Sequence, residues 1–111
     1  MHRRIMPVEY VYVLVRADLT PKQQMVQAIH AALEAGYVFR ELRAEQDEHW
    51  LVLCTVPDEQ ALHDARAHLE QADIGHYVFH EPDDGLGYTA LATQPIEKRQ
   101  RKHLRRFELW G

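Results

Sequence analysis

Four polar side chains recur at helical spacing in the first third of the chain. Gln23, Gln27, His30 and Glu34 are separated by four, three and four residues, so they share one side of a predicted helix. Amide and imidazole groups in this arrangement can orient a polar substrate. Lys22 lies at the start of the same helix, where free backbone N–H groups and the positive end of the helix dipole attract negative charge. A single histidine on a helix is also commonly structural, and this alternative stays open.

Two predicted elements must position these groups. A strand over residues 8–14 is rich in β-branched and aromatic residues, and it leads through Arg16 into the helix. Thr20, Pro21 and Gln23 predict the start of the helix as a capping box with proline at its first position, and Gly36 predicts its end. Ligands of α/β sheets favour the carboxyl ends of strands, so we expect the site beside this strand-to-helix turn.

The rest of the chain alternates between strands and helices. Strands are predicted at residues 50–56, 76–80 and 88–93, with a short terminal strand at 107–110. Helices are expected to start at Pro57 and Pro95, a short helix and an acidic loop occupy residues 37–48, and residues 81–87 form a turn. On the first helix, Val26, Ile29 and Leu33 are expected to face the core. This alternation predicts a single α/β domain over residues 1–111, with helices on both faces of a sheet.

Several kinds of reactive site are excluded by spacing. His63 and His68 are five residues apart on a helix, and His76 and His80 lie about 13 Å apart along a strand, so neither pair suits one metal ion. Cys54 is the single cysteine and lies within an apolar strand, so we expect a buried side chain rather than a nucleophile or a disulfide. No phosphate-binding loop is present. We therefore expect neither a metal nor a cofactor.

Charge is distributed unevenly. Six of the 13 basic residues fall within residues 98–106, with no acid among them, whereas the remaining seven basic and 17 acidic residues give a net charge of −10. A polyanion such as a nucleic-acid backbone would be attracted to this basic pole, although a solvated helix face has the same composition. The basic pole consists of Lys98, Arg99, Arg101, Lys102, Arg105 and Arg106.

The sequence gives only indirect indications of the cellular compartment and the oligomeric state. The single cysteine favours a reducing compartment, no apolar run approaches the ~20 residues of a membrane helix, and the N-terminus does not resemble a signal peptide. A cytoplasmic protein without a membrane partner is therefore expected. An edge strand could pair across a homodimer without leaving a motif in the sequence.

The order of several motifs resembles the type 2 peptidyl-tRNA hydrolases, in particular a divergent branch described only as containing a peptidyl-tRNA hydrolase domain. The matching segments are the strand and turn at 13–19, the helix at 25–33, the strand and turn at 51–59, the strand ending at His80, residues 89–95 and the ending at 104–110. The resemblance covers residues 8–110. It implies a three-layer α/β/α sandwich with a mixed sheet of about four strands.

The resemblance also implies residue roles in hydrolysis of the ester that joins a peptide to the 3′ ribose of tRNA. Glu81 or Asp83 would orient water as general base, Gln27 and His30 would position the ester, and Lys22 would stabilise the oxyanion. The residues expected to bind the substrate are Arg16, Asp18, Thr89, Lys98, Arg101, Lys102 and Arg105.

The sequence departs from the family pattern at the expected chemistry. Gln23 stands at the position of the family's lysine, and Lys22 is one residue away, which is about 100° around the helix. The family's threonine in the turn has no counterpart in residues 81–87. The alternative function is therefore a catalytically degraded member of this fold that binds tRNA, a nucleotide or a protein partner.

Overall fold

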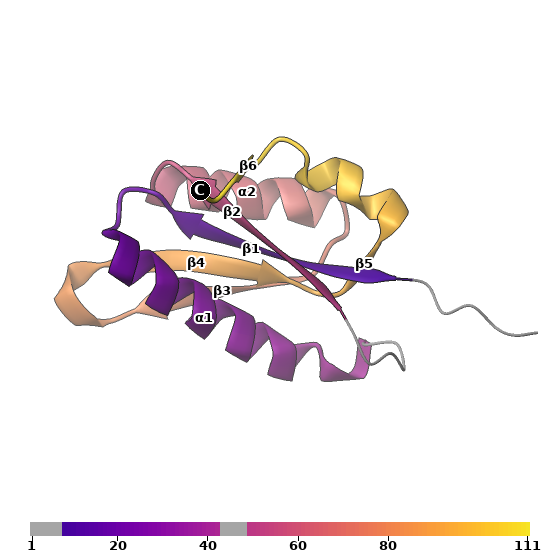
Figure 1. Ribbon diagram of the computed structural model, residues 1–111, viewed down its shortest axis with the longest axis horizontal. Coiled ribbons are helices and arrows are strands. Elements are labelled where there is room, and N and C mark those ends of the chain that lie inside the picture. Colours follow the sequence, from indigo (N-terminus) through magenta and orange to yellow (C-terminus); the bar gives the residue numbers. More distant parts are fainter. Residues whose placement is uncertain (1–7, 43–48) are drawn as a thin grey trace, which may run out of the picture.

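A mixed six-stranded sheet forms the centre of the protein, with strand order β3-β4-β1-β2-β6 and with β5 paired to β1 beside this path (Figure 1). The computed structural model describes residues 8–42 and 49–111. The strands are β1 (Glu9–Arg16), β2 (Trp50–Val56), β3 (His76–Glu81), β4 (Gly87–Thr93), β5 (Ile96–Glu97) and β6 (Glu108–Leu109). The helices are α1 (Pro21–Val38) and α2 (Glu59–Gln71), with 3-10 helices η1 (Arg40–Leu42), η2 (Asp83–Gly85) and η3 (Lys98–Leu104).

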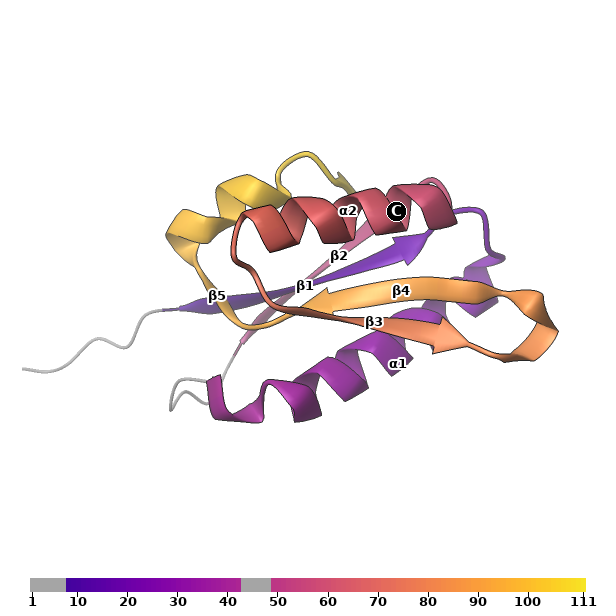
Figure 2. The same ribbon diagram turned by 180° about the vertical axis from the view of Figure 1, so that it is seen from behind.

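Strand β1 lies in the middle of the strand order and pairs with three other strands. It runs parallel to β2, from Tyr10 opposite Trp50 to Arg16 opposite Val56, and antiparallel to β4 and β5. The predicted strands at residues 8–14, 50–56, 76–80 and 88–93 all correspond to observed strands. Helices cover both faces of this sheet, α1 on one and α2 with η3 on the other (Figures 1 and 2).

The sheet has six strands rather than the four expected. The two additional strands, β5 and β6, contain two residues each and pair with β1 and β2. Two residues are too few to show the alternation of apolar and polar residues by which a strand is predicted. Strand β6 corresponds to the short terminal strand that was expected at 107–110. The segment after Pro95 is the 3-10 helix η3 preceded by β5. The acidic loop expected within 37–48 falls largely outside the described residues.

Helix α1 begins as its sequence predicts. The Thr20 hydroxyl accepts a hydrogen bond from the Gln23 backbone N–H at 3.2 Å, and the Gln23 side chain accepts one from the Thr20 N–H at 3.0 Å. This capping box satisfies two backbone donors at the helix start. The helix ends three residues later than predicted, since Gly36, the expected C-cap, lies within it and Phe39 is the C-cap.

The buried face of α1 is the reverse of the expected one. Gln27 and three alanines are buried, whereas Val26, Ile29 and Leu33 are 44%, 66% and 66% exposed. Alanine side chains allow the helix to pack closely on the sheet, where Ala90 and Ala92 of β4 are also small. The larger aliphatic residues therefore lie outside this contact. The buried alanines of α1 are Ala28, Ala31 and Ala35.

The larger core lies on the opposite face of the sheet, beneath α2 and η3. Leu62 and Leu69 of α2 and Leu104 of η3 pack with Leu14 and Leu91 of the sheet, and all five side chains are at most 1% exposed. Leu62, Ala65 and Leu69 are the buried residues of α2. Among the described residues, no helix is long and apolar enough to span a membrane.

Candidate functional site

A β-bulge aims Thr89 at helix α1. Phe79 of β3 pairs with Ala90 of β4, but the next residue, His80, pairs with Tyr88, so Thr89 is the additional residue on its strand. A bulge disrupts the alternation of side chains and is common beside functional sites because it redirects one of them. The Thr89 side chain consequently reaches the α1 face, where it is fully buried.

A chain of hydrogen bonds links Thr89 to a carboxylate through Gln27. The Thr89 hydroxyl donates to Gln27 Oε1 at 2.6 Å, and Gln27 Nε2 donates to Glu81 Oε2 at 3.3 Å. An amide oxygen is not a base, so Thr89 has no group here that could activate it as a nucleophile. Glu81 is the titratable member of the chain and can act as a general base toward water.

The expected neighbourhood of α1 and the turn at 81–87 is therefore observed. Gln27 and Glu81 meet across it, and the first turns of α1, the carboxyl end of β1 and the β3–β4 turn lie at one end of the molecule (Figure 1). Gln27 is in direct contact with both Glu81 and Thr89. Sequence motifs suggested all three, but the bulge that joins Thr89 to the other two leaves no signal in the sequence.

The contact between Thr89 and Gln27 should stabilise the fold. We expect Thr89→Val to lower the free energy of unfolding by about 1–3 kcal/mol, because it leaves the buried Gln27 oxygen without its donor. Urea denaturation measures this loss. Gln27→Leu in the Thr89→Val background should cost less than the sum of the two single changes, since an apolar pair leaves no orphaned oxygen. Additive costs would show that the two side chains are not coupled.

His30 stacks on a neighbouring aromatic ring instead of projecting freely from α1. Its imidazole lies parallel to the Phe79 ring, with centroids 4.6 Å apart and an interplanar angle of 4°. His30 is half-buried. It follows Gln27 by three residues and so shares the side of α1 that faces β3. The polar stripe was expected to lie away from the core, but Gln27 and His30 face the sheet, so His30 contributes to packing.

Replacing His30 should therefore have a moderate effect on stability. We expect His30→Ala to cost about 1 kcal/mol, since stacked rings contribute roughly 0.5–1.5 kcal/mol beyond their buried area. His30→Phe should retain most of this stability. Thermal unfolding of the two variants tests the assignment, and an equal loss in both would contradict stacking as the role of the ring.

Arg16 joins the β1–α1 loop to the β3–β4 turn. Its Nε and one terminal nitrogen each donate to the Asp18 carboxylate at 2.9 Å, and the other terminal nitrogen donates to the carbonyls of Leu86 and Tyr88 at 2.6 and 3.1 Å. That nitrogen also lies 3.9 Å from Glu59, whose carboxylate accepts the Tyr88 N–H at 2.7 Å. Arg16 and Asp18 are thus bonded within the protein rather than presented to a substrate.

The Arg16–Asp18 pair makes the stability of the fold depend on pH in the acidic range. The hydrogen bond from Arg16 lowers the pKa of the Asp18 carboxyl below its usual range. Because the pKa of Asp18 is lower in the folded than in the unfolded protein, the ionised carboxylate stabilises the fold at pH values above the unfolded-state pKa of about 3.9. This stabilisation is lost as the pH falls through the folded-state pKa.

We therefore expect Asp18→Asn to destabilise the protein at neutral pH by about 0.2–1 kcal/mol, a modest value because the Asp18 side chain is 42% exposed. The difference from wild type should shrink as the pH falls below about 4. Denaturation at several pH values measures it, and a difference that persists unchanged in strong acid would contradict the pairing.

Two proposed catalytic groups are not joined to this network. Lys22 is exposed on α1, five residues before Gln27 and therefore about 140° around the helix from it. Gln23 is engaged in the capping box. Asp83 is exposed in η2, two residues beyond Glu81. The geometry thus favours Glu81 over Asp83 as the base.

Helix η3, which carries Lys98, Arg99, Arg101 and Lys102 of the basic pole, lies at the other end of the molecule from Glu81. η3 follows β5, which pairs with Glu9 and Tyr10 at the amino end of β1, whereas Arg16 ends the strand (Figure 1). Six residues of strand separate Tyr10 from Arg16 by about 20 Å. A substrate that contacts both the basic pole and Glu81 must therefore be long.

Aromatic residues support one side of the basic pole. Arg101 donates to the Tyr12 hydroxyl at 2.8 Å and stacks on Tyr10 at 4.1 Å, and the hydrogen bond raises the pKa of Arg101. Lys98 and Arg105 join Arg101 and Tyr12 around a hollow of about 210 Å³. Lys102 lines a separate hollow of about 290 Å³ beside Asp73 and Arg99. Arg101 is therefore partly structural, whereas Lys98, Lys102 and Arg105 are exposed.

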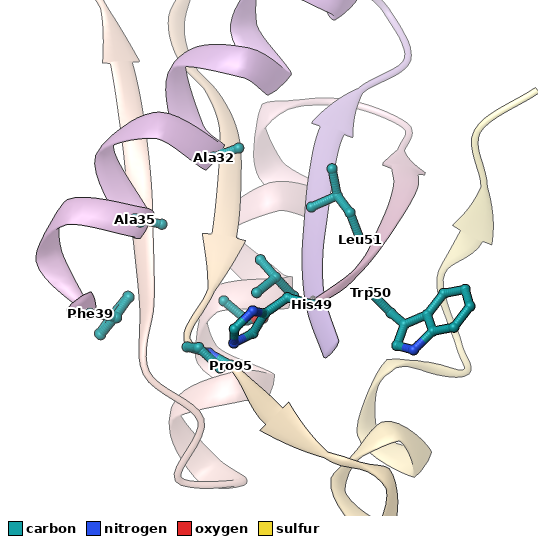
Figure 3. A pocket seen from close by; sticks show the side chains of 10 residues that line it. Ala32, Ala35, Phe39, His49, Trp50, Leu51 and Pro95 are labelled. Carbon is teal, nitrogen blue, oxygen red and sulfur yellow. The ribbon is translucent and has the colours of Figure 1, made fainter. Parts of the chain in front are cut away.

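Two further hollows are formed by residues that no sequence motif brings together. One of about 540 Å³ lies at the carboxyl ends of β1 and β2, between α2 and β6, and includes Asp64, Arg106 and Glu108. The other, of about 220 Å³, is mainly apolar and lies between the end of α1 and the start of β2 (Figure 3). His49 borders the second hollow and approaches Glu9 at 3.2 Å. Both hollows combine residues distant in sequence.

Metal binding finds no support in the described residues. No group of three histidine, cysteine, aspartate or glutamate side chains there could hold an ion. Cys54 is 1% exposed, and burial raises the pKa of its thiol, so little thiolate forms.

Comparison with known proteins supports the fold alone. No family model matches the chain, and no curated protein matches it. Among solved structures, the chain is similar to a protein of unknown function, Atu0240 from Agrobacterium tumefaciens strain C58. The TM-score is 0.72 at 13% sequence identity, and the match covers 96% of this chain and 100% of the other. The arrangement of strands and helices is thus shared with a solved protein whose function is not stated.

Proposed function

We propose that this protein is a peptidyl-tRNA hydrolase-like enzyme that cleaves the ester between a peptide and the 3′ end of tRNA. The observation that carries the proposal is the contact of Gln27 with both Thr89 and Glu81 beside the first turns of α1. The resemblance implies these residues for this chemistry, and they lie beside the carboxyl end of β1. The three-layer sandwich implied by the resemblance belongs to the same proposal.

In the proposed reaction, Glu81 accepts a proton from water as the water oxygen attacks the ester carbonyl. The tetrahedral intermediate then collapses, and the proton passes to the leaving 3′ oxygen of the ribose. Gln27 holds the Glu81 carboxylate in place and has a second N–H that can face the ester oxygen. No role in stabilising the oxyanion is assigned to Lys22, because it projects from a different side of α1.

The basic pole is proposed to hold the tRNA backbone. Lys98, Lys102 and Arg105 are exposed there, and contacts to phosphates position a nucleic acid without reading its sequence. The separation of about 20 Å along β1 fits a long polynucleotide whose acceptor end reaches Glu81.

Hydrolysis of a labelled N-blocked aminoacyl-tRNA tests this function. We expect wild-type protein to release the blocked amino acid and leave the tRNA intact and deacylated. Intact deacylated tRNA distinguishes ester hydrolysis from nuclease activity, and a preparation inactivated by heat controls for spontaneous hydrolysis. Failure to release label at high protein concentration would contradict the enzymatic function.

A binding protein without hydrolytic activity is the second candidate. It is favoured by the internal pairing of Arg16 with Asp18 and with two backbone carbonyls, because the resemblance assigns both residues to the substrate. Such a protein would retain tRNA, a nucleotide or a protein partner. Retention of labelled tRNA on a filter without release of the amino acid would support this candidate.

A further inference from the structure

Helix α1 presents an apolar stripe to solvent. Met25, Val26, Ile29, Leu33 and Tyr37 are between 44% and 66% exposed. Val26, Ile29 and Leu33 are separated by three and four residues, the spacing at which one helix packs along another. Scattered apolar residues are normal on a surface, but a continuous patch of this kind marks an interaction site.

An apolar trough lies beside this stripe, between α1 and β2. A hollow of about 240 Å³ is lined by Met25 and Ile29 of α1 and by Leu51 and Leu53 of β2, with further apolar residues. It shares Ala32 and Leu51 with the hollow of about 220 Å³ near the end of α1, so the two hollows adjoin. Figure 3 shows Ala32 and Leu51 projecting into the space between their two elements.

The trough exists because α1 does not cover the whole sheet face. The helix packs against β4, β3 and β1, and β2 lies beyond its edge. Leu51 is consequently 66% exposed, although its side chain is on the same face of β2 as Leu53, which reaches the core beneath α1. Another helix placed beside α1 would cover both the exposed stripe and this part of β2.

We propose that the occupant is α1 of a second copy of this chain, in a two-fold dimer. The stripe and the trough adjoin on one molecule, so a two-fold axis places the stripe of each copy against the trough of the other and covers both surfaces at once. An antiparallel helix pair centred near Ile29 brings Val26 opposite Leu33 of the partner subunit. No charged residue belongs to the stripe between positions 25 and 37, so identical helices meet without repulsion of like charges.

The exposed area matches what a stable dimer requires. Full burial of an aliphatic side chain corresponds to about 60–120 Å², so the stripe and Leu51 offer on the order of 300–500 Å² of apolar surface per copy. A standard interface buries about 800 Å² per partner, of which a little over half is apolar. Gln27 and His30 lie on the side of α1 toward β3, so the dimer leaves the candidate site open.

Cross-linking at Ile29 tests the geometry. Ile29→Cys should form a disulfide-linked dimer on mild oxidation, seen as a band at twice the 13.0 kDa of one chain on a non-reducing gel. Cys54 does not interfere because it is 1% exposed. Ala67→Cys places a thiol at an exposed position of α2 as the matched control, and it should remain monomeric. Equal linkage in both variants, or none at position 29, would overturn the proposal.

The mass in solution provides an independent test. Wild type and Ala67→Glu should be dimers by light scattering, whereas Ile29→Glu should be a folded monomer with an unchanged circular dichroism spectrum. A wild-type chain that stays monomeric at its highest soluble concentration would overturn the proposal and leave the stripe to a different partner. A dimer that survives Ile29→Glu would also overturn it.

Discussion

Glu81→Gln should reduce hydrolysis of an N-blocked aminoacyl-tRNA by about 10²–10⁴-fold, the usual contribution of a general base. Glutamine retains the shape of the side chain and can still meet Gln27 with its amide, but it cannot accept a proton from water. The release rate under single-turnover conditions measures the effect on the chemical step. Binding of the tRNA should be unchanged, because the basic residues of η3 lie about 20 Å away along β1.

Two controls make this prediction specific to Glu81. Glu70→Gln removes a carboxylate from an exposed position of α2 and should leave the release rate unchanged. Asp83→Asn tests the second carboxylate suggested by the sequence, and we expect a small effect because Asp83 is not joined to Gln27. If Asp83→Asn abolishes release while Glu81→Gln does not, the assignment of the base is wrong.

Charge reversal at the basic pole should weaken tRNA binding and flatten its dependence on salt. The logarithm of the binding constant falls linearly with the logarithm of the salt concentration, and each phosphate contact contributes about 0.7–0.9 to the slope. The double variant Lys98→Glu with Arg105→Glu loses one or two such contacts, so its slope should be smaller by the corresponding amount. All tRNAs should be affected alike, because backbone contacts carry no sequence information. Filter binding at several salt concentrations measures the slope.

These two positions are preferable to Arg101, which holds Tyr10 and Tyr12 and would disturb packing if replaced. Lys98 and Arg105 are exposed, so their substitution should change stability by less than about 0.5 kcal/mol. Gly36→Glu adds negative charge at an open position of α1, on the opposite face of the sheet from η3, and should leave the slope unchanged. Equal slopes in wild type and the double variant would identify η3 as a solvated surface.

Sequence patterns located the elements well where local chemistry determines them. The capping box at Thr20 fixes the start of α1, and the apolar runs of β1 and β2 identify strands within one or two residues. The face of α1 could not be obtained in this way. Both the aliphatic stripe with Val26 and the alanine stripe with Ala31 have helical periodicity, and only the tight contact with Ala90 and Ala92 decides which one faces the sheet.

In the candidate site, too, the sequence indicates individual residues but not the tertiary contacts between them. Gln27, Glu81 and Thr89 were identified by type and position, but their contact depends on a bulge in β4 that has no signature in the sequence. Arg16 and Asp18 were expected to face a substrate, whereas tertiary contacts pair them within the fold. Lys22 was expected at the site, and its place around the helix from Gln27 separates it from the network.

The most direct test of the proposed function follows bound tRNA and released amino acid in the same reaction. An N-blocked aminoacyl-tRNA labelled in both its amino acid and its RNA is mixed with excess wild-type protein, and both labels are followed with time. We predict that the amino acid is released while the tRNA stays intact. Retention of the RNA with the amino acid still attached would contradict hydrolysis, and the protein would then be a tRNA-binding member of this fold.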